Sequence, residues 1–158
     1  MTTKQMPNEE FLPFVIEMLD SHEGKTVTLP LRGRSMRPFL EDGRDKALLI
    51  RAQEGDIRIG DAVLAEVSPK CYVLHRIIAI DGQQVTLRGD GNLTNEYCRL
   101  TDIKAKALGF FRKGSSRLDS TSSTKWKVYS WLWTRLFPIR RYLLFLLFPH
   151  IPARFKKK

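Results

Sequence analysis

The sequence predicts a mainly β protein, in which a small coiled β-barrel or sheet follows a short helix and precedes an amphipathic helical tail. Three observations favour this fold class. Short aliphatic and β-branched runs alternate with turn residues from Lys25 to Arg112. Apolar residues recur at helical spacing before this region. An aromatic, basic segment follows it after a polar stretch.

The central block, residues 25–112, is expected to form one β domain. Turns such as EDG, IRIGD, IDGQ and GDGN separate its strand-like runs. Because Pro30 lacks the N–H that a sheet interior requires, its strand is expected at an edge or a bulge. The runs are TVTLPLR, KALLIRA, DAVLAEV, YVLHRIIAI, QQVTLRG and KAKALGFF.

A short amphipathic helix is expected within residues 8–21, inside an N-terminal segment that covers residues 1–24. Asn8 is suited to cap this helix, and the two acids that follow are suited to its first turn. Pro13 cannot donate a hydrogen bond one turn back, so a start near Leu12 is the alternative. The apolar residues with helical spacing are Phe11, Phe14, Val15, Met18 and Leu19.

The chain beyond residue 112 divides into a linker and a tail. Residues 113–124, KGSSRLDSTSST, have no apolar period and are expected to be a flexible linker. Residues 125–158 contain all three tryptophans in an amphipathic pattern that Pro138 should interrupt. Neither apolar stretch of the tail approaches the roughly 20 uninterrupted apolar residues that are needed to span a bilayer.

Two interpretations of the tail remain open. It could lie in the interface of a membrane that contains anionic lipid. It could instead pack on its own domain or on a partner. In the first interpretation the membrane-interface residues are Trp126, Trp131, Trp133, Arg140 and Arg141.

The formal net charge of +10 is concentrated at the end of the chain. Eleven of the 27 Lys and Arg residues, but only one of the 17 acids, lie between Lys113 and Lys158, so the first 112 residues are electrically balanced. The body is therefore not a basic domain. The tail is too apolar for phosphate contacts alone, and no nucleic-acid partner is expected.

The cysteine content and the N-terminus indicate the compartment. Cys71 and Cys98 are too few for a disulfide framework and are compatible with a reducing environment. No cleavable signal peptide is recognised, so a cytoplasmic protein, or one peripheral to the cytoplasmic membrane, is expected.

Neither a metal nor a cofactor is expected. Cys71 and His75 would lie about 13 Å apart along one strand, too far to share an ion. No glycine motif of a nucleotide-binding loop occurs in the sequence.

Two residues suit nucleophilic catalysis. Ser35 stands in LRGRSMRPFLEDG, where a strand-to-turn corner would expose its hydroxyl. His75 lies in a run that is apolar on both faces and is expected to be buried. Burial favours the neutral imidazole, which can accept a proton. Two carboxylates, Asp90 and Glu96, follow in RGDGNLTNEYC.

The ordered pattern G-x-S-M-x-P, a β-run, GD, a strand with H-R-I, and GD-x-N spans about residues 30–110. It resembles the catalytic domain of type I signal peptidases and of the related LexA-like self-cleaving proteases. Bacterial signal peptidases and LexA-like proteins use a lysine base, whereas the endoplasmic-reticulum and archaeal branch uses histidine. The resemblance therefore implies a Ser-His-acid triad with Ser35 and His75. Gly33, Met36 and Pro38 are expected to shape the corner and the substrate cleft.

The resemblance leaves the triad acid open between two residues. In the histidine branch the acid lies a few residues beyond the GD pair, which favours Glu96. Asp90 belongs to the GD pair itself, where relatives use the aspartate as a turn and support residue. Arg76 is expected to pair with a carboxylate or with carbonyl groups.

The implied activity is that of a serine endopeptidase that processes a leader or signal-like segment of a peptide or protein. Relatives prefer small residues just before the scissile bond. The Ser35 backbone N–H would be one oxyanion donor, and Gly33 replaces a residue whose hydroxyl assists in bacterial relatives. One alternative is a catalytically silent membrane- or partner-binding module on the same fold. A self-cleaving regulator is disfavoured because no Ala-Gly or Cys-Gly bond precedes Ser35.

Overall fold

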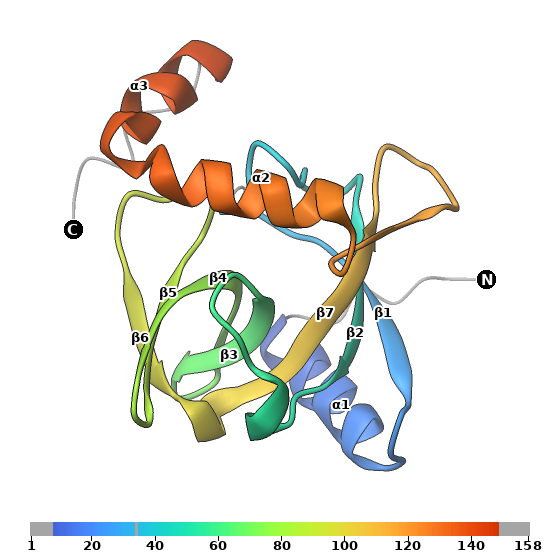
Figure 1. Cartoon of the computed structure of the whole chain (residues 1–158). Coiled ribbons are helices and arrows are strands. Elements are labelled where there is room, and N and C mark those ends of the chain that lie inside the picture. Colours follow the sequence, from blue (N-terminus) through green and yellow to red (C-terminus); the bar gives the residue numbers. More distant parts are fainter. Residues whose placement is uncertain (1–7, 34, 149–158) are drawn as a thin grey trace.

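An eight-stranded antiparallel sheet forms the body of the protein in the computed structural model, which describes residues 8–33 and 35–148 (Figure 1). The strand order is β1-β2-β7-β3-β4-β5-β6, and β8 pairs with β7 beside this path. The strands are β1 Thr26–Pro30, β2 Lys46–Arg51, β3 Ala62–Ser68, β4 Cys71–Asp81, β5 Gln84–Arg88, β6 Glu96–Arg99, β7 Ile103–Phe111 and β8 Leu118–Ser120.

Three α-helices and two short 3-10 turns complete the fold over the residues that the structure describes. The bounds are α1 Asn8–Asp20, η1 Glu54–Asp56, η2 Leu100–Asp102, α2 Thr124–Arg135 and α3 Phe137–Leu147. Figure 1 shows α2 lying across the top of the sheet, with α1 near its lower end. The prediction of a mainly β protein with a short N-terminal helix and a helical tail is confirmed.

All six predicted runs form strands, and Pro30 ends β1, which pairs only with β2 at the edge of the sheet. An edge strand tolerates proline because one side of its backbone needs no ladder hydrogen bond. The helix α1 begins at Asn8 and contains Pro13, so the alternative start near Leu12 is wrong. Packing of Val15 and Leu19, each 1% exposed, compensates for the missing backbone hydrogen bond.

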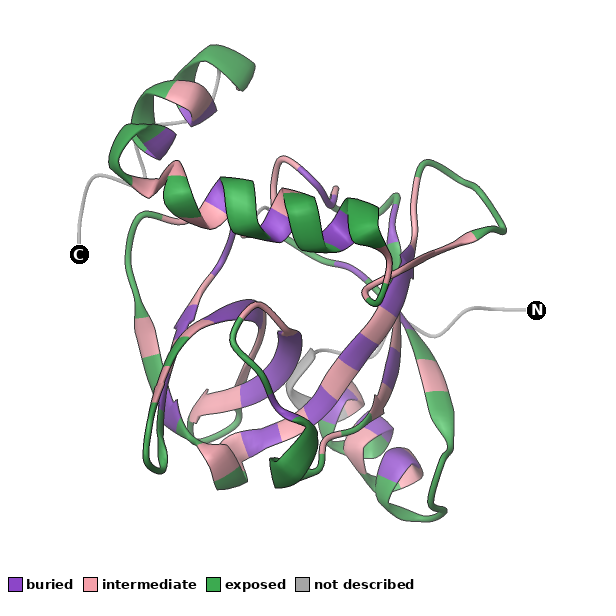
Figure 2. Ribbon diagram, in the orientation of Figure 1, coloured by how far each residue is buried: buried purple, intermediate pink, exposed green. Residues whose placement is uncertain are grey.

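The core lies in two apolar clusters on the sheet. One joins α1, β1, β2, β7 and α2, and the other fills the curve of β3 to β7. Trp126 of α2 belongs to the first cluster and is 4% exposed, with its ring centroid 5.0 Å from Phe39 and 5.1 Å from Phe110. The tail helix is therefore part of the core, as the buried bands along α2 in Figure 2 show.

Residues 113–124 are not a featureless linker, in contrast to the prediction. β8 lies within them and pairs with Gly109–Phe111 of β7, beyond the part of β7 that pairs with β3. Gly109 permits this approach, because a Cβ there would lie 2.7 Å from the Asp119 carbonyl oxygen. Ser123 then caps α2 by accepting a hydrogen bond from the Trp126 N–H.

Two tryptophans of α2 provide a matched test of this packing. Trp126→Ala should lower the free energy of unfolding by about 3–5 kcal/mol, because it leaves a cavity in the core. Trp131 is 58% exposed, so Trp131→Ala should change the free energy of unfolding by no more than about 0.5 kcal/mol. Urea unfolding of both variants measures this difference, and equal losses would contradict the packing of α2 on the sheet.

Candidate active site

Ser35 lies in the loop that joins β1 to β2, and this loop is closed by its own hydrogen bonds. The Leu31 N–H donates to the Asp45 carbonyl over 3.0 Å, and the Gly43 N–H donates to the Leu31 carbonyl over 3.1 Å. The Gly33 N–H donates to Asp42 Oδ1 over 2.8 Å. Gly33 has a φ of +85°, which favours glycine over any residue with a hydroxyl side chain.

The buried carboxylate of Asp45 anchors the far end of this loop. Its oxygens accept hydrogen bonds from the backbone N–H groups of Glu41 at 2.9 Å and Lys113 at 3.0 Å, and from the Arg44 guanidinium. Burial raises the pKa of Asp45, but these donors outweigh that effect and hold its pKa below the ordinary value. A charged, fully bonded carboxylate therefore fixes the loop that carries Ser35.

The loop after β5 holds the backbone of Ser35 from the other side. The Gly91 N–H donates to the Ser35 carbonyl over 2.7 Å. Gly89 packs against the same carbonyl, and a Cβ at this position would clash with it. Glycine is required here for close approach. The sequence pattern marked GDGN as a turn but did not indicate that it supports the serine.

His75 is 3% exposed at the middle of β4, and its partner is Glu96 at the start of β6. Its Nδ1 lies 2.6 Å from Glu96 Oε2. Both atoms are buried, and neither has a hydrogen-bond partner among the described residues. The two atoms are within hydrogen-bond distance, but their alignment is not that of a hydrogen bond. Since Glu96 occupies Nδ1, Nε2 is the ring nitrogen left for another group.

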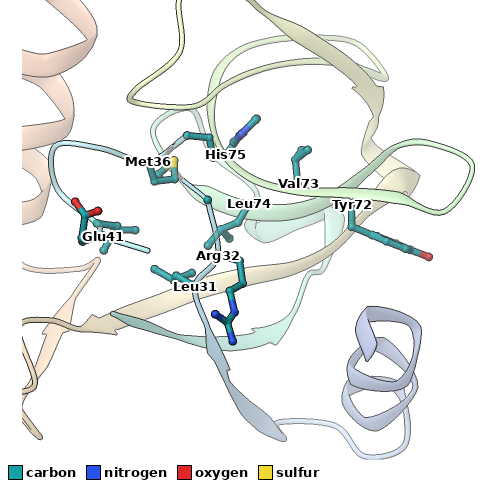
Figure 3. A pocket seen from close by; sticks show the side chains of 11 residues that line it. Leu31, Arg32, Met36, Glu41, Tyr72, Val73, Leu74 and His75 are labelled. Atoms are coloured by element: carbon teal, nitrogen blue, oxygen red, sulfur yellow. The ribbon is translucent and has the colours of Figure 1, made fainter. Parts of the chain in front are cut away.

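A small cleft is lined by both Ser35 and His75. Its volume is about 140 Å³. Figure 3 shows the lining side chains, which come from the loop after β1 and from the start of β4. The remaining wall is mainly apolar and is formed by Leu31, Met36, Leu40, Tyr72, Val73 and Leu74, with Arg32, Gly33 and Glu41 at the polar part.

Two of the three residues expected to shape the cleft line it, and the third does not. Gly33 and Met36 line the cleft, as expected. Pro38 does not line it and is half-buried one turn further along the loop. Leu31 and Tyr72 line the cleft without having been singled out in the sequence, because their apolar character is equally typical of a core position.

Asp90, the alternative acid, pairs with Arg76 instead of His75. Arg76 Nε and Nη2 donate to the two Asp90 oxygens over 2.8 and 2.7 Å, and both residues are 1% exposed. Burial lowers the pKa of Arg76, but the Asp90 carboxylate outweighs this and raises its pKa above the ordinary value. The expected pairing of Arg76 with a carboxylate is confirmed, and Asp90 has the support role.

The tail helix completes the surroundings of this ion pair. The Tyr129 hydroxyl donates to Asp90 Oδ2 over 3.0 Å, and Trp133 Nε1 donates to the Asp90 carbonyl over 2.8 Å. Arg76 also donates to the Ser130 hydroxyl and, over 3.1 Å, to the Gly60 carbonyl. The contacts of α2 with Arg76 and Asp90 join residues 39 to 54 positions apart, so no sequence pattern indicated them.

The prediction that five tail residues lie at a membrane interface is wrong for three of them. Trp126, Trp133 and Arg140 are 4%, 6% and 2% exposed. Arg140 donates to the Trp133 carbonyl over 2.8 Å, and burial lowers its pKa to about 10. Trp131 and Arg141 are exposed. The inward face of α2 was predictable from its spacing, but its attachment to this domain was not.

Over residues 8–33 and 35–148, no group of three or more His, Cys, Asp and Glu side chains is placed to hold a metal ion. Comparison of the chain with protein-family models and with curated proteins finds no match.

The two acids should differ in their effect on stability. Asp90→Asn leaves the charge of Arg76 buried and should lower the free energy of unfolding by about 3–5 kcal/mol. Glu96→Gln, whose side chain is 36% exposed, should cost no more than about 1 kcal/mol. Urea unfolding of the two variants tests this order, and a larger loss in Glu96→Gln would reverse the roles assigned to the two acids.

Proposed function

We propose that this protein is a serine endopeptidase of the signal-peptidase type, in which Ser35 is the nucleophile, His75 the general base and Glu96 the orienting acid. The single observation that carries the proposal is the position of His75. Its Nδ1 faces Glu96, and the residue lines the cleft that Ser35 also lines. The β domain and the Ser-His-acid order agree with the resemblance to the histidine branch.

The proposed reaction is acyl transfer. Ser35 Oγ attacks the peptide carbonyl while His75 Nε2 takes its proton, and an acyl-enzyme forms when that proton passes to the leaving amine. A water molecule, deprotonated by His75, then releases the acid and regenerates the serine. Glu96 holds the ring orientation and stabilises the imidazolium. Since the Gly33 N–H is bonded to Asp42, the N–H of Ser35 itself is the oxyanion donor that we propose.

The shape of the cleft supports an extended peptide as the substrate. Within the part of the chain that the structure describes, β4 pairs with β5 only from Arg76 onward, and Tyr72 to His75 pair with β3 alone. This backbone edge is free to add a peptide strand beside the cleft. The cleft is well below the roughly 300–1,000 Å³ of a small-molecule site, and it has room for a small side chain before the scissile bond.

A degenerate peptide library, analysed by mass spectrometry, tests the activity. We expect cleavage after small residues, and Ser35→Ala should reduce the rate by about 10³-fold or more. Glu96→Gln should reduce the rate by about 10²–10⁴-fold while it costs no more than about 1 kcal/mol of stability, because it removes the orientation of His75. Ser116→Ala, at an exposed serine remote in sequence, is the matched control and should retain the full rate.

Two outcomes of this experiment contradict the proposal. Equal cleavage by the wild type and by Ser35→Ala would exclude the assigned nucleophile. If the folded wild type cleaves nothing in the library, the catalytically silent module becomes the better account. Incubation of the protein alone, with its 18.3 kDa mass monitored, separates self-cleavage from cleavage of an added peptide.

A further inference from the structure

Apolar stripes remain uncovered on the outer sides of the two tail helices. Large apolar side chains are exposed at i, i+3 and i+4 spacing on each helix, opposite to the buried residues. Trp131 is 58% exposed, Phe145 69% and Leu146 74%. The stripes also include Leu132 on α2 and Ile139 and Tyr142 on α3. Exposed patches of this kind mark interaction sites.

The charge on these helices is of one sign. Lys127, Arg135 and Arg141 are exposed beside the apolar stripes. After Asp119 the sequence contains no Asp or Glu, and it adds Arg154 and three terminal lysines. A surface that covers the stripes must therefore accept large apolar side chains and supply negative charge around them.

Helix length restricts how these helices could meet a bilayer. Within the described ranges no helix is long and apolar enough to cross a membrane. α2 has 12 residues and α3 has 11, about 18 and 16 Å at 1.5 Å per residue, against a hydrocarbon core of about 30 Å. Short amphipathic helices with aromatic and basic residues are suited to lie in the headgroup region.

We propose that α2 and α3 dock the protein onto the surface of an anionic lipid bilayer through Trp131, Leu132, Ile139, Tyr142, Phe145 and Leu146. The exposed cations interact with the lipid phosphates around these side chains. A second copy of the chain is disfavoured as the occupant, because two such surfaces carry the same charge. The proposal is independent of the peptidase activity.

The attachment of α3 brings this surface close to the proposed active site. The Arg37 guanidinium, two residues from Ser35, lies 4.4 Å from the centroid of the Phe148 ring just beyond α3. Arg88 lies 3.5 Å from the Phe137 ring at the start of the helix. Docking would therefore hold the loop that carries Ser35 near the lipid surface.

Co-sedimentation of the full-length Ser35→Ala protein with vesicles tests the proposal without any contribution from catalysis. We expect binding to vesicles that contain phosphatidylglycerol, weaker binding to phosphatidylcholine alone, and release by salt. Phe145→Ala with Leu146→Ala should weaken binding about tenfold or more. The matched control is Phe14→Ala with Ile59→Ala, which removes a similar pair at 51% and 62% exposure and should retain binding.

Trp131 provides a second, site-specific measurement, since it is the exposed member of the three tryptophans. Its fluorescence should shift to shorter wavelength on phosphatidylglycerol vesicles, and Trp131→Phe should lose this shift while it still sediments.

Three outcomes would overturn the proposal. These are no sedimentation with anionic vesicles, sedimentation that the tail variant and its control share equally, and a concentration-dependent dimer that the tail variant abolishes without lipid binding. Far-UV circular dichroism and urea unfolding confirm that each variant is folded.

Discussion

The buried ion pair of Arg76 and Asp90 joins the three parts of the protein on which the proposed function depends. Arg76 follows His75 on β4, and Asp90 stands between the two glycines that contact the Ser35 carbonyl. Two charges removed from water are tolerated only when each is paired and hydrogen-bonded. The bidentate contact therefore constrains the distance between the histidine strand and the serine loop.

The same constraint explains why the tail helix belongs to the domain. Trp126 covers the Arg76 guanidinium at 4.7 Å, and Tyr129 and Trp133 donate to Asp90. Without α2 the ion pair would face water, and its constraint on the two loops would weaken. The inner face of α2 thus supports the proposed catalytic geometry, while its outer face carries the stripe that we assign to lipid. One helix would then link membrane docking to the shape of the cleft.

The patterning of the sequence was sufficient for much of the fold and for part of the site. Alternating apolar runs predicted six strands, and the motif order predicted that Ser35 and His75 belong together. β6 and β8 were missed because strands of four and three residues carry too little periodicity. The resemblance favoured Glu96 as the acid and left Asp90 as the alternative. It did not indicate the tertiary contacts, in which Asp90 pairs with Arg76 and Glu96 lies beside His75. Helical spacing likewise predicted two faces for the tail but not which face the domain would bury.

The reactivity of Ser35 toward an alkyl fluorophosphonate tests the central claim most directly. In this reaction the serine oxygen bonds to phosphorus, fluoride leaves, and the histidine accepts the serine proton. Intact mass and peptide mapping should find one adduct, on Ser35, and labelling should slow by about 10³-fold or more in His75→Ala. An adduct on another residue, or equal labelling of Ser35 with and without the imidazole, would contradict the account.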